Sequence, residues 1–245
     1  MQKEEYEQAI DELVGTSIDA IMFCLGDGRT VLHDTKVGEL WGHNMETWTH
    51  EIFRRAHQNA RALIDAGHDP LRVVSERARE KGIAFYPTLL VQQSRGDRRE
   101  DTRCSNFRFE NTHLEIGAKP CEEELPYATC LDFMHQDVQD ERFDLISETL
   151  RCYEVDGFEL QMNYTPHYFH PSEIEQGQSV LTDWIRRVYE EVKDSGPDRH
   201  LIIRIPASIS GCESVGMDVR TWINEGIVDA FVGQTFSGPE LINSN

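Results

Sequence analysis

Residues 155–163 read Val155-Asp156-Gly157-Phe158-Glu159-Leu160-Gln161-Met162-Asn163, an alternation of apolar and polar side chains that opens on Val-Asp-Gly. A similar joint, an apolar residue followed by aspartate and a small residue, returns at Ile18-Asp19-Ala20 and at Val228-Asp229-Ala230. Each joint follows a helical pattern and precedes a strand-like run. Recurrence at equivalent points predicts repeated βα units, which form either a barrel or an open doubly wound sheet.

Five strands are predicted, each following a helical segment. They cover residues 19–25, 83–91, 155–163, 201–207 and 228–235. A doubly wound nucleotide-binding sheet needs a Gly-rich phosphate turn, and Gly26-Asp27-Gly28 lacks the full GxGxxG pattern. The sequence therefore favours an α/β fold of the (β/α)8 TIM-barrel type. Because a closed barrel has eight strands, we expect an incomplete barrel holding about strands two to six.

The whole chain, residues 1–245, is predicted to form this single partial barrel domain, with a long loop insertion at about 92–130. Within the insertion, residues 106–116 are expected to form a short hairpin. Loops of this length in a compact domain usually have a function. The aspartates of the three joints fall at strand N-termini, which is the stability face of a barrel, so we expect a structural role for them.

Composition excludes several classes of function. The chain has 24 Lys and Arg against 44 Asp and Glu, a net charge of −20, so neither nucleic acid nor an anionic membrane surface is an expected partner. No apolar run reaches the roughly 20 residues that span a bilayer. The first residues carry no apolar leader, so we expect a cytoplasmic protein unless the N-terminus is incomplete. The six cysteines form no CxxC pair, and neither a disulfide framework, a metal nor a cofactor is expected.

Candidate catalytic groups follow from barrel geometry, since chemistry in these folds lies at the C-terminal ends of the strands. The period of two places Glu159, Gln161 and Asn163 on one face of their strand, pointing into the barrel. A buried carboxylate needs a partner, and Arg204 on the next strand is well placed. Glu159 is then either half of a packing ion pair or a tuned catalytic carboxylate, with Asp27 and Asp132 as possible catalytic partners.

Further residues near the strand ends suit a sugar ligand. Aromatic rings stack on the apolar face of a sugar, and amides both donate to and accept from hydroxyls. The predicted substrate-binding residues are Arg204, Gln161, Asn163, Tyr164, His167, Tyr168, Gln234 and Gln92. Core packing and ordinary loop positions are the alternatives for these residues. His167 and His170 are also conceivable metal ligands, although their spacing does not bring them together in a helix or a strand.

The second half of the chain resembles the glycosyl-hydrolase-like (β/α)8 barrels known as family-10-like glycosylhydrolases. The similar segments are Leu131–Arg142 and Tyr153–Glu159, with weaker agreement over Trp222–Asp229. The resemblance implies a barrel that acts on glycosidic bonds. Such barrels commonly continue Asp-Gly-Ile-x-x-Asp, with the second aspartate as a catalytic residue, whereas Gln161 stands at that position here.

Three hypotheses follow. The first is a glycoside hydrolase that acts on a poly- or oligosaccharide through a carboxylate acid/base pair, with Glu159 and either Asp27 or Asp132. The second is a catalytically inactive carbohydrate-binding barrel, which Gln161 favours because an amide is neither a nucleophile nor an acid. The third is a metal-dependent barrel enzyme using His167 or His170. The sequence indicates no particular sugar, linkage, stereochemical outcome or oligomeric state.

Overall fold

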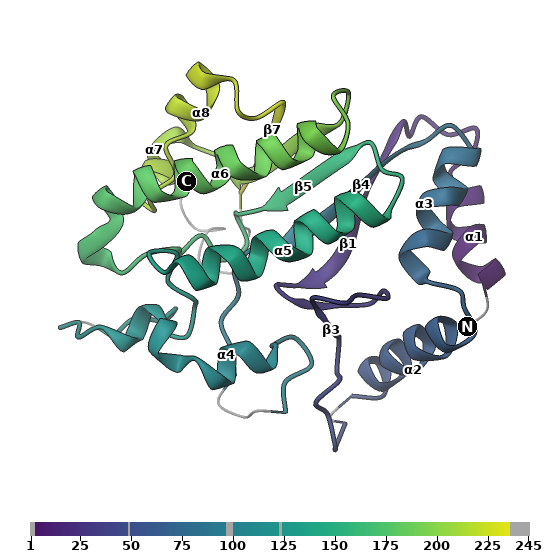
Figure 1. Ribbon diagram of the computed structural model, residues 1–245, viewed down its shortest axis with the longest axis horizontal. Helices are drawn as coiled ribbons and strands as arrows, with labels where there is room; N and C mark the ends of the chain where they lie inside the picture. The colour runs from purple at the N-terminus through teal and green to yellow at the C-terminus, as the bar shows by residue number, and fades with distance from the viewer. Residues whose placement is uncertain (1–2, 49, 97–99, 123, 236–245) are drawn as a thin grey trace.

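The computed structural model describes residues 3–48, 50–96, 100–122 and 124–235, which fold around one twisted sheet (Figure 1). The strands are β1 (Ala20–Asp27), β2 (Thr30–Val31), β3 (Glu39–Leu40), β4 (Ala84–Leu90), β5 (Gly157–Gln161), β6 (His200–Pro206) and β7 (Ala230–Gln234). Their order is β3-β2-β1-β4-β5-β6-β7. The five longest strands, β1, β4, β5, β6 and β7, are parallel, whereas β2 pairs antiparallel with β1 and parallel with β3.

Helices lie before and between the parallel strands, and several of them pack against the strand that follows. They are α1 (Lys3–Asp11), α2 (Glu51–Asp65), α3 (Pro70–Glu80), α4 (Asn106–Glu110), α5 (Gln136–Cys152), α6 (Ile174–Ser195), α7 (Ile209–Glu213) and α8 (Val219–Glu225). Figure 1 shows α5 and α6 side by side in front of β5, and the two helices pack against each other. Between helices and sheet lies a continuous apolar core that includes Phe158, Leu160, Trp184 and Ile203.

The order of the parallel strands distinguishes the two predicted architectures. A doubly wound sheet reverses its strand order at a switch point. Here β1, β4, β5, β6 and β7 succeed one another in chain order without reversal, as in a barrel. The predicted fold class is confirmed: the described residues form a partial (β/α) barrel, and its five parallel strands coincide with the five predicted from sequence.

The aspartates at two of the Val-Asp joints fasten neighbouring strands together. Asp156 Oδ2 accepts a hydrogen bond from the backbone N–H of Phe85 at 2.7 Å, and Asp229 Oδ2 accepts one from that of Leu201 at 2.7 Å. The structural role predicted for these side chains is therefore confirmed. Gly157 has a φ of 154°, and a Cβ there would lie 2.0 Å from the carbonyl oxygen of His200, so only glycine fits the joint.

The insertion after β4 does not contain the predicted hairpin. Residues 106–116 form α4 and the 3₁₀ turns η1 (Thr112–Leu114) and η2 (Ile116–Ala118), so that prediction was wrong. Leu114, Glu115 and Ile116 are consecutive and all buried, which differs from the alternation of buried and exposed side chains in a half-exposed strand. Within the described ranges, no helix is both long enough and apolar enough to cross a membrane.

Candidate functional site

A cavity of about 640 Å³ opens at the C-terminal edge of β5, β6 and β7. It is lined by Ser94, Pro126, Tyr127, Asn163, Tyr164, Thr165, Pro166, His167, Pro206, Ala207, Ser208, Gln234 and Thr235. Most of these residues follow directly after a parallel strand, the position where barrel folds carry their sites. The cavity size falls within the range of small-molecule pockets.

A chain of hydrogen bonds connects the barrel interior with the wall of this cavity. Arg204 donates from Nε and Nη2 to Glu159 Oε1, at 2.8 and 2.6 Å. Arg204 Nη1 donates to Gln234 Oε1 at 3.2 Å, and Asn163 Nδ2 donates to the same oxygen at 3.3 Å. The predicted pairing of Glu159 with Arg204 is confirmed. The network also joins four of the predicted site residues from three consecutive strands or strand ends.

Two acceptors of this network have no hydrogen-bond partner among the described residues. They are Glu159 Oε2 and Asn163 Oδ1, both buried. Glu159 itself is fully buried, whereas the Arg204 side chain is 22% exposed. An unsatisfied buried acceptor costs about 1–3 kcal/mol, and more when it is charged, so a network that only filled the barrel would be expected to satisfy both. Each of these oxygens therefore keeps an unused acceptor position, although both are buried.

Aromatic rings form the other side of the cavity. The rings of Tyr127 and His167 are stacked, with centroids 3.7 Å apart and an interplanar angle of 6°. Partial burial lowers the pKa of His167 below its ordinary value, so the imidazole is neutral at pH 7. Tyr164 is 46% exposed at the rim. The cavity thus combines an uncharged aromatic wall with amide groups, a combination that suits a ligand with both apolar and hydroxylated faces.

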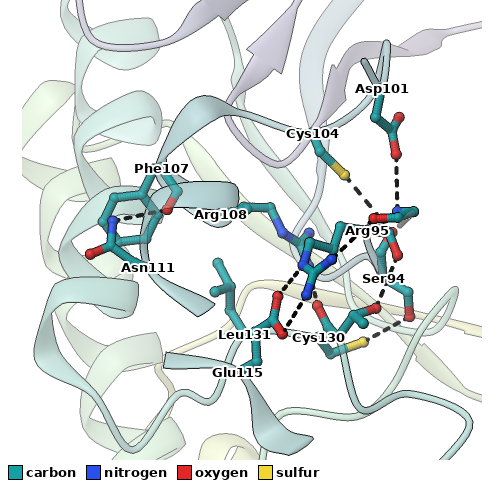
Figure 2. Close-up of polar contacts among 12 residues, drawn as sticks. Ser94, Arg95, Asp101, Cys104, Phe107, Arg108, Asn111, Glu115, Cys130 and Leu131 are labelled. Carbon is teal, nitrogen blue, oxygen red and sulfur yellow. Dashed lines mark hydrogen bonds and ion pairs between the residues drawn. The ribbon is translucent and has the colours of Figure 1, made fainter. Parts of the chain in front are cut away.

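The insertion supplies Tyr127 and is held in place by the contacts drawn in Figure 2. Arg95 forms a two-pronged ion pair with Glu115, in which Nη2 lies 3.0 Å from Oε2. Arg108 Nη2 donates to the carbonyl of Thr129 at 2.6 Å. Ser94, at the cavity edge, has its Oγ 3.3 Å from the sulfur of Cys130. These contacts join the beginning of the insertion to its later part, close to Tyr127 in the sequence.

Two predicted binding residues, Gln92 and Tyr168, lie behind the cavity. Gln92 Nε2 donates to the backbone carbonyls of Leu131 and His167, at 2.6 and 2.8 Å. Tyr168 is fully buried and packs edge-on against Phe133. Both side chains support the loops around the cavity and have no surface toward it.

Gln161 occupies the inner face of β5, two residues beyond Glu159, and is partly buried. Its side chain is not among those that line the cavity. Its backbone pairs in register with Leu90 and Arg204 on the two neighbouring strands. The residue is thus part of the barrel lining below the cavity.

Asp132 is fully buried away from the cavity. Its Oδ2 accepts from Lys119 Nζ at 2.8 Å and its Oδ1 from the backbone N–H of Met134 at 2.9 Å. Partial burial lowers the pKa of Lys119, but its ion pairs with Asp132 and Glu173 outweigh that effect and raise the pKa above its ordinary value. Both oxygens of Asp132 are engaged in holding the chain together.

Asp27, the remaining candidate carboxylate, ends β1 at the C-terminal edge of the sheet, where its backbone pairs with Leu90 of β4. Its side chain lies outside what the structure describes.

The metal ligands that the sequence suggested, His167 and His170, do not form part of a metal-binding group among the described residues. Across the described ranges, no three His, Cys, Asp or Glu side chains form a group that could hold a metal ion.

Sequence reasoning missed Tyr127, because it lies within the insertion and far in sequence from every strand end. A usable signal was Leu125-Pro126-Tyr127, an apolar and aromatic segment directly after the three glutamates at 122–124. Its partner His167 was predicted to bind substrate, and it lines the cavity together with Tyr127. The two rings meet only in the folded chain.

Comparison with known proteins gives a likeness in fold. No protein-family model matches the sequence, and no match was found among curated proteins. Among solved structures, the chain is similar to the endo-1,4-β-mannanase from Rhizomucor miehei (TM-score 0.56, 11% identity, 100% of this chain and 66% of the other). It is also similar to a cycloisomaltooligosaccharide glucanotransferase from Paenibacillus sp. (TM-score 0.54, 11% identity, 96% of this chain and 32% of the other). A third similar structure is α-L-fucosidase isoenzyme 2 from Paenibacillus thiaminolyticus (TM-score 0.50, 12% identity, 83% of this chain and 29% of the other).

These matches support the barrel fold that the sequence resemblance implied, but they do not single out the family-10-like group. At identities of 11–12% the likeness extends to the fold alone. The chain spans 29% of the fucosidase, 32% of the glucanotransferase and 66% of the mannanase.

Proposed function

We propose that this barrel is a glycosidase-like protein that binds an oligosaccharide in the cavity at its C-terminal edge and uses Glu159 in hydrolysis of the glycosidic bond. The observation that carries the proposal is the buried Glu159 carboxylate, which is connected through Arg204 and Gln234 to the cavity wall and has one oxygen without a described partner. The likeness to carbohydrate-active barrels adds support from the fold.

Each part of the site has a distinct task in this proposal. Tyr127 and His167 offer a flat surface to a sugar ring. Gln234 and Asn163 bind hydroxyls, since amides both donate and accept. Arg204 orients Glu159 as acid, base or nucleophile, and Oε2 is the oxygen left for the reaction. Since the Glu159 side chain is fully buried, hydrolysis requires that substrate binding opens a path between Arg204 and Gln234.

A hydrolase of the usual kind needs a second carboxylate. Asp27 is the better candidate, because it ends a strand at the same edge of the sheet. Asp132 is the weaker one, because both of its oxygens are bound to other groups of the protein.

A second candidate function is sugar binding without turnover. It is favoured by the composition of the cavity wall, where no carboxylate occurs among the described lining residues. In this case the Glu159–Arg204 pair holds the amides in place and performs no reaction.

The test compares wild-type protein with Glu159→Gln, which keeps the shape and removes the charge. Both are screened for binding of neutral oligosaccharides, including β-1,4-mannan, α-1,6-glucan and fucosyl fragments, and for release of reducing ends. Hydrolysis through Glu159 predicts a loss of turnover of about 10²-fold or more, with a much smaller loss of affinity. Binding without turnover in the wild type would support the second candidate, and turnover unaffected by the substitution would exclude Glu159 from the chemistry.

A matched control is Glu154→Gln, the same chemical change shortly before the start of β5. Glu154 is 71% exposed and forms a surface ion pair with Arg79 at 3.4 Å. Because surface pairs contribute little to stability, binding and turnover are expected to equal those of the wild type.

A further inference from the structure

The orientation of the Gln234 amide is determined by charge. Its Oε1 accepts from Arg204 Nη1 and from Asn163 Nδ2. The oxygen and nitrogen of an amide have similar shapes, but a guanidinium group has only donors, so the Gln234 atom that faces Arg204 must be the oxygen. Gln234 therefore directs its NH₂ group away from Arg204. Asn163, which must donate to Gln234, keeps its buried Oδ1 without a partner among the described residues.

Arg204, the cation that holds Gln234 in the cavity wall, is neutralised by a carboxylate. Both close contacts of Arg204 with a carboxylate go to Glu159 Oε1, and a third donor goes to Gln234. The described lining residues include no Asp, Glu, Lys or Arg. What the described wall presents to a ligand is thus the amide donor of Gln234, several hydroxyls and aromatic rings, while the acceptor Asn163 Oδ1 is buried. These groups match the alternating donors and acceptors of sugar hydroxyls.

Resting on the proposed carbohydrate function, we propose that Glu159 makes the cavity selective for neutral sugars over sugars that carry a carboxylate. A carboxylate moved from water into the cavity would lose its hydration and find no unpaired cation. Arg204, the cation bound to the lining residue Gln234, is already bound to a carboxylate of the protein itself. Selection of this kind works by rejection of the wrong ligand as well as by attraction of the right one. Glu159 acts here as a specificity-determining residue, whatever its part in hydrolysis.

The test uses matched sugars that differ only at C6. The neutral probes are β-1,4-mannohexaose and cellohexaose, and the acidic probes are β-1,4-hexamannuronate and the C6-oxidised cellohexaose. Affinities are measured by titration calorimetry at about 0.15 M salt, where long-range repulsion from the net negative chain is screened. The quantity compared is the ratio of acidic to neutral affinity for each protein variant, so that a general loss of affinity cancels.

Glu159→Gln leaves the Arg204 charge unbalanced, and we expect the ratio to rise at least about tenfold, as a charge-assisted hydrogen bond would give. Glu154→Gln changes the net charge by the same amount at an exposed position and should leave the ratio as in the wild type. The double variant Glu159→Gln/Arg204→Gln removes both charges and should return the ratio to the wild-type value. A ratio that stays unchanged in Glu159→Gln, or stays high in the double variant, would overturn the inference.

Gln234→Ala provides a second route if Glu159→Gln does not fold, because Gln234 is exposed and the buried pair remains intact. Neutral affinity should fall, since a donor is lost, while acidic sugars stay excluded. A rise in acidic affinity would show that shielding by Gln234, and not neutralisation by Glu159, excludes them. If the wild type binds none of the oligosaccharides, the proposed function itself fails. If it binds neutral sugars and the ratios do not move, only this inference fails.

Discussion

Glu159 and Asp132 are both fully buried carboxylates, and each is paired with a cation on another segment of the chain. Asp132 has both oxygens satisfied, one by Lys119 and one by a backbone N–H. Glu159 accepts two hydrogen bonds on Oε1 and has no described partner on Oε2. Its cation, Arg204, also donates a hydrogen bond to Gln234 in the cavity wall. Complete satisfaction is typical of a structural carboxylate, whereas an unpaired oxygen beside a cavity is typical of a functional one.

The largest expected effect concerns the Glu159 side of this comparison. Arg204→Met leaves the buried carboxylate without its cation, and we expect the free energy of unfolding to fall by about 3–5 kcal/mol. Urea unfolding measures the change. Arg186→Met is the control, since Arg186 forms surface pairs with Asp183 and Glu225, and its loss should cost about 1 kcal/mol or less. An unchanged stability of Arg204→Met would mean that the buried pair is not formed.

A third buried polar residue, His33, extends the comparison to a region remote from the cavity. Burial lowers the pKa of His33 to about 4, although Glu148 and Asp34 act in the opposite direction. In the unfolded chain His33 has its ordinary pKa of 6.5, so between pH 6.5 and pH 4 the unfolded chain binds a proton that the folded chain does not. The stability contributed by neutral, buried His33 is therefore complete above pH 6.5. It is lost progressively as the pH falls from 6.5 toward 4.

The loss approaches about 3 kcal/mol near pH 4, from the difference between the two pKa values. The measurement is the free energy of unfolding at pH 7 and at pH 4.5 for the wild type and for His33→Leu. The variant should lose less stability between the two pH values, by roughly 2–3 kcal/mol. Equal losses in both proteins would show that His33 is protonated in the folded state at the lower pH.

Asp132→Asn tests the structural side of the comparison and should have a smaller effect. Asparagine keeps an acceptor for Met134, and Lys119 is 34% exposed and retains Glu173, so we expect a loss of about 1–2 kcal/mol in unfolding free energy. The free energy of sugar binding should change by less than the free energy of unfolding does. A loss of turnover without a change in stability would restore Asp132 as a catalytic candidate.

The strands and the Glu159–Arg204 pair were predictable from sequence, because a period of two and the need to compensate a buried charge are local rules. The helical structure of residues 106–116 was not predictable, because that segment is shaped by contacts outside itself, such as the isolated bridge between Glu115 and Leu131. At the site, the positions of Gln92 and Tyr168 were likewise not predictable from local sequence patterns. Residue type suggested sugar contacts, whereas tertiary packing placed both side chains behind the cavity.

The smallest predicted effect belongs to the part of the site that sequence did not indicate. Tyr127 contributes a ring stacked on His167, so Tyr127→Ala should weaken the binding of a neutral oligosaccharide by about 1 kcal/mol, the usual value of one aromatic contact. Tyr127→Phe keeps the ring and should bind nearly as the wild type does. Titration calorimetry of the three proteins gives the comparison. If Ala and Phe weaken binding equally, the hydroxyl and not the ring makes the contact, and the aromatic wall is not a sugar platform.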